Sequence, residues 1–261
     1  KKVFVYPGGT IIPIVNSLIK KKIQIEVFKS EQGAGYAALA CGRITKKAQV
    51  VMVTSGPGVT NLMSVIADSY YDSTPLIAIT GQIGTKDLSS RPNVRQRGFQ
   101  EVPTVDITNK ITKYSFCVKK NSNIEKEILR AFDIANNGRM GPVVIDFPMD
   151  IQRSKTKSLS TLKIDKYNVE SKPLNNSNKK IIKKIVKYSS QAKRAIILLG
   201  QGALIEGQYA YYKKISDAIN AHVVTSLMGI GSYDTSNKKY LGYIGHTGHY
   251  VANKAVHEAD L

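Results

Sequence analysis

Short apolar segments alternate along the chain with longer segments whose apolar residues recur at helical spacing. Before residue 152 the pattern predicts strands at 3–6, 23–28, 49–54, 76–80 and 143–146. It predicts helices at 11–21, 33–44, 59–70 and 124–136. Short apolar strands that alternate with helices favour parallel pairing with right-handed crossovers. We therefore expect an α/β fold with a doubly wound parallel sheet in a first domain, residues 1–152.

A second α/β unit follows a polar connector. Residues 153–178 have little apolar content and many Ser, Lys and Asn, which indicates a linker. In 179–187 the apolar pairs recur at helical spacing and the lysines take the other face, which is typical of a solvated amphipathic helix. Beyond it the pattern predicts strands at 195–199 and 222–225 and helices at 206–220 and 249–258. We expect a second doubly wound domain, incomplete, at 179–261.

The net charge of +19 raises the question of nucleic-acid binding. Between residues 152 and 195, 13 Lys or Arg stand against only Asp165 and Glu170. These lysines belong largely to the linker and to the amphipathic helix, and no recognition motif accompanies them, so we expect no nucleic-acid partner. No apolar run approaches the roughly 18 residues that span a membrane, and no signal peptide opens the chain. Cys41 and Cys117 have no metal or redox spacing, which favours reduced thiols in a cytoplasmic protein.

Glu31 is the most informative single residue. It follows the predicted strand at 23–28 and precedes a helix whose small residues, Gly33 to Cys41, allow close packing. A carboxyl at the C-terminal end of a buried strand tends to be partly desolvated, so that it binds protons more readily and can share one with a bound heterocycle. The alternative is that Glu31 only occupies the first turn of a helix, where the helix dipole favours a negative charge.

Further motifs precede and follow Glu31 in a fixed order. They are Tyr6-Pro7-Gly8-Gly9, Thr54-Ser55-Gly56-Pro57-Gly58-Val59-Thr60-Asn61, Thr80-Gly81-Gln82, Gly98-Phe99-Gln100-Glu101 and Gly141-Pro142-Val143-Val144-Ile145-Asp146-Phe147-Pro148. The ordered set resembles the large subunit of acetolactate synthase (acetohydroxyacid synthase) and its thiamine-diphosphate-dependent relatives. The resemblance covers residues 3–152 and continues more weakly to Leu261. It implies a pyrimidine-binding domain followed by a central domain.

The resemblance also implies a chemistry. Thiamine diphosphate would be the cofactor, with Glu31 as the catalytic residue, hydrogen-bonded to N1′ of the aminopyrimidine ring. The implied cofactor-binding residues are Gly8, Gly9, Glu31, Gly56, Pro57, Asn61 and Gln82. Phe99 and Gln100 would line the substrate site, although plain core packing is the alternative for Phe99. The implied reaction is decarboxylation of a 2-oxo acid such as pyruvate and carboligation to a second carbonyl.

Two differences from acetolactate synthases leave the identity of the substrate open. Ser30 stands where acetolactate synthases usually carry His, and Met149 stands where they usually carry Lys. Two interpretations of the segment 86–97 stay open: Arg91, Arg95 and Arg97 supply an alternative anion-binding group, or the segment is an ordinary solvated loop. A related carboligase or decarboxylase for another 2-oxo acid is therefore one alternative. A catalytically inactive homologue that acts as a scaffold is another.

The second domain resembles the central domain that binds FAD in true acetohydroxyacid synthases and is empty or differently occupied in others. Gly200-Gln201-Gly202 follows a predicted strand but lacks the third glycine of a dinucleotide fingerprint. His246 and His249 have no further ligands to complete a metal site, so we expect none here. The resemblance places the diphosphate and Mg²⁺ in a third domain marked by Gly-Asp-Gly, which does not occur in this chain. We expect that domain to be missing, the Mg²⁺ site to lie outside this segment, and the active unit to be at least a homodimer.

Overall fold

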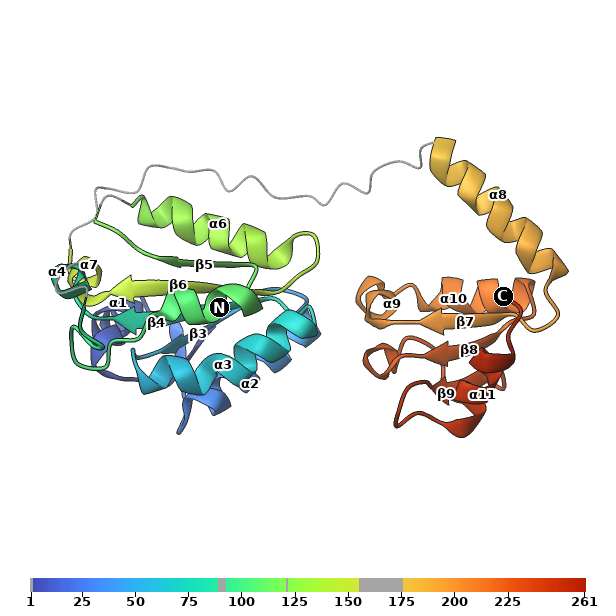
Figure 1. The fold of residues 1–261 in the computed structure, drawn as a ribbon, viewed down its shortest axis with the longest axis horizontal. Helices are drawn as coiled ribbons and strands as arrows, with labels where there is room; N and C mark the ends of the chain where they lie inside the picture. The colour runs from blue at the N-terminus through green and yellow to red at the C-terminus, as the bar shows by residue number, and fades with distance from the viewer. Residues whose placement is uncertain (1, 89–92, 121, 155–175) are drawn as a thin grey trace. The chain divides into compact units, whose positions relative to one another are not determined.

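A computed structural model describes residues 2–88, 93–120, 122–154 and 176–261 (Figure 1). The chain divides into two compact units, residues 1–169 and 170–261. Most of the predicted linker at 153–178 lies outside the described residues, and the predicted domain limits stay predictions. Within the described residues, no helix is both long and apolar enough to cross a lipid bilayer.

The first unit is built on a six-stranded sheet of order β2-β1-β3-β4-β6-β5, and every neighbouring pair is parallel. Its strands are β1 (Lys2–Val5), β2 (Gln24–Val27), β3 (Gln49–Val53), β4 (Leu76–Gln82), β5 (Tyr114–Cys117) and β6 (Pro142–Pro148). All residues of β6 are buried, as a strand covered on both faces requires. Because the strands are parallel, their carboxyl ends meet at one edge of the sheet.

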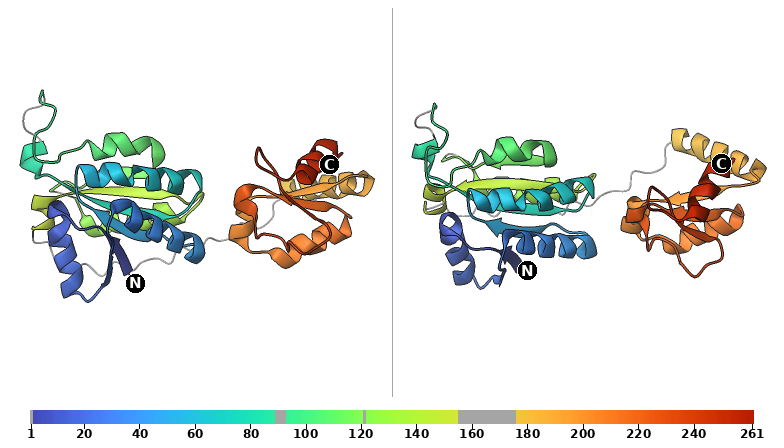
Figure 2. Two further views of the ribbon diagram at one scale, coloured as in Figure 1. Left: turned by 90° about the horizontal axis from the view of Figure 1, so that it is seen from below. Right: turned by 60° about the horizontal axis from the view of Figure 1, so that its bottom comes forward.

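Helices cover both faces of this sheet (Figures 1 and 2). The helical elements of this unit are η1 (Gly9–Ile11), α1 (Ile12–Lys20), α2 (Glu31–Thr45), α3 (Pro57–Tyr71), α4 (Thr85–Leu88), α5 (Thr104–Thr108), η2 (Asn109–Ile111), α6 (Ile124–Asn136) and α7 (Met149–Gln152). On one face, Leu39 of α2 and Leu62 of α3 pack with Val51 of β3. On the other face, Ala131 of α6 packs with Val143 of β6. The expected doubly wound α/β fold is confirmed.

The second unit contains a parallel three-stranded sheet of order β7-β8-β9. Its elements are α8 (Asn176–Gln191), β7 (Ile196–Leu199), α9 (Gln201–Glu206), α10 (Tyr209–Ala218), β8 (His222–Thr225), η3 (Leu227–Gly229), β9 (Tyr240–Tyr243) and α11 (Tyr250–Glu258). Leu199, Val223 and Tyr233 form its buried core. The predicted amphipathic helix at 179–187 lies within α8, where Ile185 and Val186 are exposed together with the lysines.

The sequence pattern did not predict the short helices α4, α5 and α7 or the 3-10 turns η1, η2 and η3, and it differs from the structure at three larger elements as well. The single helix predicted at 206–220 is wrong, because Gly207 adopts a left-handed conformation (φ 66°) that ends α9 before α10 begins. Strand β5 was not predicted, since it is only four residues long and its residues are half-buried. Strand β9 was not predicted either, because it contains Gly242 in the left-handed region and its pairing with β8 is irregular.

Candidate active site

Glu31 is a buried carboxylate at the start of a helix. It is the first residue of α2, and the Ser30 hydroxyl caps this helix by accepting a hydrogen bond from the Gly33 backbone N–H at 3.0 Å. The first-turn position considered from sequence is therefore correct. However, only 7% of Glu31 is exposed, so the helix end does not leave its carboxylate in water. A buried carboxylate is costly unless hydrogen bonds compensate for the lost hydration, and its partners therefore matter.

The partner of Glu31 is Asn61, which lies near the start of α3. Asn61 Nδ2 donates a hydrogen bond to Glu31 Oε2 at 3.1 Å. Among the described residues, no donor reaches the other carboxylate oxygen, Oε1. One oxygen of Glu31 is thus held by the protein while the second keeps its capacity to bind a hydrogen-bond donor.

The contact between Glu31 and Asn61 depends on the close approach of α2 and α3. At Gly35, one turn after Glu31, a Cβ atom would lie 2.6 Å from Leu62 Cδ1 and 2.9 Å from Val65 Cγ2. Such distances are far inside van der Waals contact, so only glycine allows the two helices to lie this near to each other. The small residues of α2 therefore allow it to pack closely against α3, as the sequence pattern indicated.

The turn at Gly8 and Gly9 is joined to the end of β3 by a hydroxyl network. Thr10 Oγ1 lies 2.9 Å from Thr54 Oγ1 and also accepts the Ser55 backbone N–H at 2.9 Å. At Gly8 a Cβ would lie 2.4 Å from Thr54 Cβ, whereas at Gly9 it would meet nothing within 4 Å. Gly8 is thus required by packing, and the space beside Gly9 is open to a ligand.

Gly56 and Pro57 form the turn that opens α3. Gly56 has φ 63° and ψ −121°, a conformation that disfavours any side chain, and Pro57 is the first residue of the helix. A Cβ on Gly56 would lie 2.8 Å from Gln100 Cβ and 2.9 Å from the Gln100 carbonyl oxygen. The structure thus brings together two motifs that are more than forty residues apart in the sequence.

Phe99 lies beside Gln100 but points away from the protein core. It is 84% exposed, so the alternative of core packing for this residue is wrong. Its neighbour Gln100 contacts the Gly56 turn, so the Phe99 ring is exposed at the same end of the sheet as this turn. Of the predicted site residues, Gly8, Glu31, Gly56 and Asn61 belong to the carboxyl ends of β1, β2 and β3 or to the helices that start there.

Gln82 differs from the other predicted residues because its amide is used within the protein. It is 2% exposed, and its Nε2 donates to Asp146 Oδ2 at 2.8 Å and to the Val102 carbonyl at 2.9 Å. Its Oε1 accepts the Ile83 backbone N–H at 2.9 Å. No N–H of this amide is left for a cofactor, so the geometry favours a supporting role for Gln82 in place of cofactor binding.

Asp146 is a buried carboxylate that the sequence did not identify as a candidate functional residue. It is 2% exposed and accepts hydrogen bonds from Thr80 Oγ1 at 2.7 Å and from Gln82. Burial raises the pKa of Asp146 to about 6, although the hydrogen bonds from Thr80 and Gln82 act in the opposite direction. The residue links β4 to β6 from within the sheet, and we see its role as structural.

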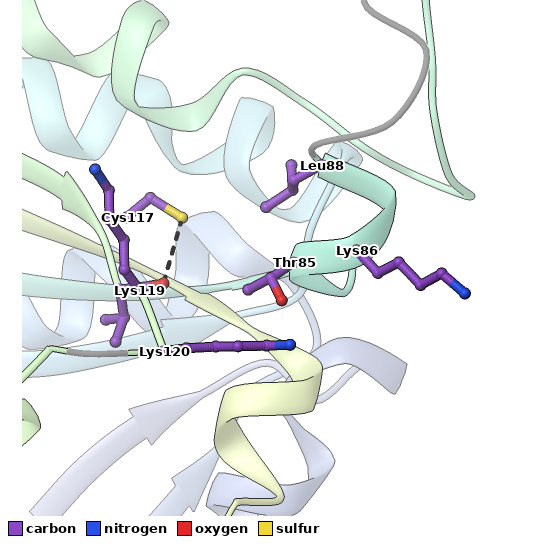
Figure 3. A pocket seen from close by; sticks show the side chains of 7 residues that line it. Thr85, Lys86, Leu88, Cys117, Lys119 and Lys120 are labelled. Carbon is purple, nitrogen blue, oxygen red and sulfur yellow. Dashed lines mark hydrogen bonds between the residues drawn. The ribbon is translucent and has the colours of Figure 1, made fainter.

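A separate cavity of about 600 Å³ lies between α4 and the end of β5 (Figure 3). Its lining includes Thr85, Lys86, Cys117 and Lys120. Burial, with a contribution from the Asp146 charge, raises the pKa of the Cys117 thiol to about 12, so it is no nucleophile at neutral pH. Lys86 extends away from the cavity in Figure 3. This cavity does not include Glu31, and its chemistry does not support catalysis.

In the second unit, the turn Gly200-Gln201-Gly202, which partly matches a dinucleotide fingerprint, does not require glycine at either position. Gly200 is extended (φ −94°), and a Cβ on Gly202 would meet nothing within 4 Å. The His249 ring packs against Tyr243 with centroids 4.9 Å apart, beside a hollow of about 470 Å³. Within the described residues, no group of three or more His, Cys, Asp or Glu side chains gathers for a metal.

Comparison with known proteins gives the family. Residues 1–108 match the family "Thiamine pyrophosphate enzyme, N-terminal TPP binding domain", and residues 182–261 match "Thiamine pyrophosphate enzyme, central domain". The chain belongs to the thiamine pyrophosphate enzymes. The two matches correspond to the two units of the structure, and the sequence-based resemblance is confirmed.

Curated proteins named as acetolactate synthase large subunits align with nearly the whole chain. The large subunit of acetolactate synthase isozyme 3 from Escherichia coli (strain K12) is 35% identical over 266 residues, covering 100% of this chain and 45% of the relative. The acetolactate synthase large subunit of Porphyra purpurea is 36% identical, covering 99% of this chain and 44% of the relative. A probable acetolactate synthase large subunit from Methanocaldococcus jannaschii is 35% identical, with 100% and 43% covered. The chain therefore spans less than half the length of these relatives.

Proposed function

We propose that the full-length protein uses thiamine diphosphate to decarboxylate a 2-oxo acid, pyruvate in the first instance, and to join the product to a second carbonyl. This is the acetolactate synthase reaction named for the relatives that align with the chain. One observation carries the proposal: the buried Glu31 carboxylate has Oε2 held by Asn61 and, among the described residues, no donor on Oε1. A carboxylate so arranged suits a proton shared with a ring nitrogen.

The residues around Glu31 fit the aminopyrimidine end of the cofactor. The open space beside Gly9 and the turn at Gly56 and Pro57 provide backbone that a flat ring can approach. When bound, the cofactor supplies the carbanion chemistry that decarboxylation of a 2-oxo acid requires. In this proposal Glu31 holds a proton at the ring nitrogen, Asn61 fixes the direction of the carboxylate, and the Phe99 ring excludes water from the acid's apolar side.

The remaining cofactor contacts belong to the proposal as well. Following the resemblance, we place the diphosphate and Mg²⁺ outside this chain segment and assign the active unit to at least a homodimer. FAD stays a prediction for the second unit, since the Gly200 and Gly202 positions accept side chains without a clash. Branched-chain amino acid biosynthesis would be the setting of the reaction.

A second candidate function is a related carboligase or decarboxylase. It is favoured by Met149, which places a thioether where the resembling enzymes carry a cation, at the start of α7 and directly after β6. A cation beside the site would attract the carboxylate of an acceptor 2-oxo acid, so its loss changes which acceptor is used best. Both candidates share Glu31 and the cofactor and differ in the acceptor.

The test is an assay of the full-length protein with [1-¹⁴C]pyruvate, thiamine diphosphate and Mg²⁺. We expect cofactor-dependent release of labelled carbon dioxide together with acetolactate. Release of carbon dioxide with a different carbonyl product would select the second candidate. Absence of release from pyruvate, 2-oxobutyrate and longer 2-oxo acids would contradict both and leave a scaffold without catalysis.

A further inference from the structure

Residues 98–101 form a tight turn that lies against the start of α3. The Glu101 backbone N–H donates to the Gly98 carbonyl at 3.1 Å, which leaves Phe99 and Gln100 at the centre of the turn. Gln100 has φ 60°, in the left-handed region, which is unfavourable for a residue that carries a Cβ. Since a Cβ on Gly56 would clash with Gln100, the turn has no free space between itself and the Gly56 backbone.

An ion pair joins Arg97, the residue before this turn, to Glu101, its last residue. Arg97 Nε donates to Glu101 Oε1 at 2.8 Å, and the Arg97 backbone N–H and Nη2 donate to the same carboxylate. Arg97 Nη1 donates to the Leu88 carbonyl, so the pair is also tied to the end of α4. The arginine is thereby engaged within the protein, which speaks against the anion-binding role considered for it from sequence.

Within this ion pair, the Glu101 side chain is more shielded from water than the Arg97 side chain. The side chain of Glu101 is 6% exposed and that of Arg97 is 30% exposed. Burial raises the pKa of Glu101, but the hydrogen bonds and charge of Arg97 outweigh it and hold the pKa below its usual range. Glu101 is therefore ionised at neutral pH, and its bonds to Arg97 are charge-assisted, the stronger class of hydrogen bond.

The Gln96 side chain also reaches this turn, and with its amide oxygen turned inward it accepts the Gln100 and Glu101 backbone N–H groups at 3.0 and 3.2 Å. The remaining contacts of the two central residues are few. Phe99 is exposed, so core packing does not hold it, and the conformation of Gln100 is unfavourable by itself. We propose that Arg97 and Glu101 are a positioning pair that holds Phe99 and Gln100 over the Gly56 turn, where they meet the 2-oxo acid. The inference rests on the proposed function, because it assigns the turn to substrate binding in that reaction.

Two variants of the full-length protein test the pair. Glu101→Gln keeps the shape of the side chain and removes its charge, and Arg97→Lys keeps the charge and removes the paired donors. Misplaced substrate-positioning groups cost up to about 100-fold, so we expect the KM for pyruvate to rise about 10-fold in Glu101→Gln and less in Arg97→Lys. The kcat should change less than about threefold, because binding and not the chemical step is weakened.

Asp72→Asn is the matched control. It breaks the ion pair between Arg43 and Asp72, which is located at the opposite end of α3 from Gly56. We expect its KM to equal that of the wild type. In Glu101→Gln, exchange of the cofactor's C2 proton should also equal that of the wild type, because Glu31 and Asn61 are untouched.

Amide hydrogen exchange measures the turn without any substrate. We expect the amides of residues 98–101 to exchange at least about tenfold faster in Glu101→Gln than in the wild type, and to be unchanged in Asp72→Asn. Unchanged exchange in Glu101→Gln, or an unchanged KM in an active protein, would overturn the positioning role. A wild-type protein that releases no carbon dioxide would instead overturn the proposed function, and with it the assignment of the turn to substrate.

Discussion

The turns after β3 and after β7 have the same Gly-x-Gly spacing, at Gly56 to Gly58 and at Gly200 to Gly202, and both open a helix. In the first, Gly56 has φ 63° and lies against Gln100, and a Cβ on Gly58 would be 2.9 Å from Thr54 Cγ2. In the second, the nearest atom to a Cβ on Gly200 would be Ser226 Oγ at 3.9 Å. Only the first turn needs its glycines.

The surroundings of the two turns differ in the same way. The first turn is fixed by the Thr10 and Thr54 hydroxyls, and it opens the helix whose Asn61 binds the buried Glu31. In the second unit, glycines without room for a Cβ lie outside this turn, as at Gly229, where a Cβ would lie 2.2 Å from the Leu199 carbonyl oxygen, and at Gly248, where it would lie 2.6 Å from the Tyr243 carbonyl oxygen. A glycine pattern therefore indicates a ligand site only where geometry requires the glycines and a chemical group stands next to them.

The largest expected effect concerns the carboxylate beside the first turn. Glu31→Gln should lower turnover of the full-length protein by about 10² to 10⁴, the usual contribution of a group that transfers a proton. Glutamine keeps the hydrogen bond from Asn61 but cannot take up and return a proton. Turnover and deuterium exchange at the cofactor's C2 position measure the effect. Glu206→Gln, at the end of the helix that follows the second turn, is the control, and both quantities should match the wild type there.

If Glu31→Gln leaves turnover and C2 exchange within about twofold of the wild type, Glu31 is only a carboxylate in a helix first turn. The two turns would then differ only in their packing, and no catalytic group would accompany the first one.

Replacement of the first glycine should cause the largest change in stability. Gly56→Ala places a Cβ 2.8 Å from Gln100 in a backbone conformation that alanine avoids, at a cost of about 1–3 kcal/mol. Native-state hydrogen exchange of β3 and β4 amides reports the free energy of opening of this unit. A decrease smaller than about 0.5 kcal/mol would show that the turn relaxes easily and would weaken the contrast with the second turn.

The buried acid Asp146 gives a pH test that distinguishes the two units. Because its pKa in the folded state, about 6, exceeds the ordinary value of 3.8, the folded state binds its proton more tightly. This contribution to stability is full below pH 3.8 and is lost as the pH rises through 6. From pH 7 to pH 5 the wild type should therefore gain about 1 kcal/mol relative to Asp146→Asn, in which Thr80 can rotate its hydroxyl to accept from the amide.

The matched variant for this test is Asp217→Asn in the second unit. Hydrogen bonds from Lys213 and Lys239 lower the pKa of Asp217, the opposite direction from Asp146, and the group is exposed. Hydrogen exchange of β4 amides at pH 5 and pH 7 measures the Asp146 effect. Equal pH dependence in the wild type and Asp146→Asn would contradict it.

The smallest expected effect is at the second turn. Gly202→Ala introduces a methyl group where nothing lies within 4 Å, in the first turn of α9. Alanine restricts the unfolded chain more than glycine, so we expect the second unit to become more stable by about 0.5 kcal/mol. Hydrogen exchange of β7 and β8 amides provides the measurement. A loss of stability above about 1 kcal/mol would mean that this turn also depends on its glycines.

Much of the fold could be predicted from local patterns. The longer strands of the first sheet and the helices α1, α2, α3 and α6 occur where apolar periodicity placed them. Strand β5 could not be predicted in this way, because its half-buried residues carry little periodic signal and its partner Val143 to Asp146 is distant in sequence. The break at Gly207 could have been predicted, since a glycine inside a helical pattern often ends the helix.

The site was predictable to the extent that its residues follow strands. Glu31, Gly8 and Gly56 occur at the carboxyl ends of β2, β1 and β3, which a parallel sheet necessarily brings to one edge. The role of Gln82 was not predictable, because it depends on Asp146, a residue on another strand. The same holds for Asn61 and Glu31, whose contact requires two helices to approach closely at Gly35.

The pairing of β4 with β6 also has a consequence for synthesis of the protein. Leu76 to Gln82 pair with Pro142 to Pro148 along their full length, and these partners are 66 positions later in the chain. At about 5–20 residues per second, the ribosome makes β6 roughly 3–13 s after β4. During that interval the apolar β4 lacks a neighbour on one side, which is the condition under which nascent chains bind chaperones or each other. Limited proteolysis can compare ribosome-bound chains in which β6 is still inside the exit tunnel with chains in which it is already outside. The comparison would show when β6 pairs with β4.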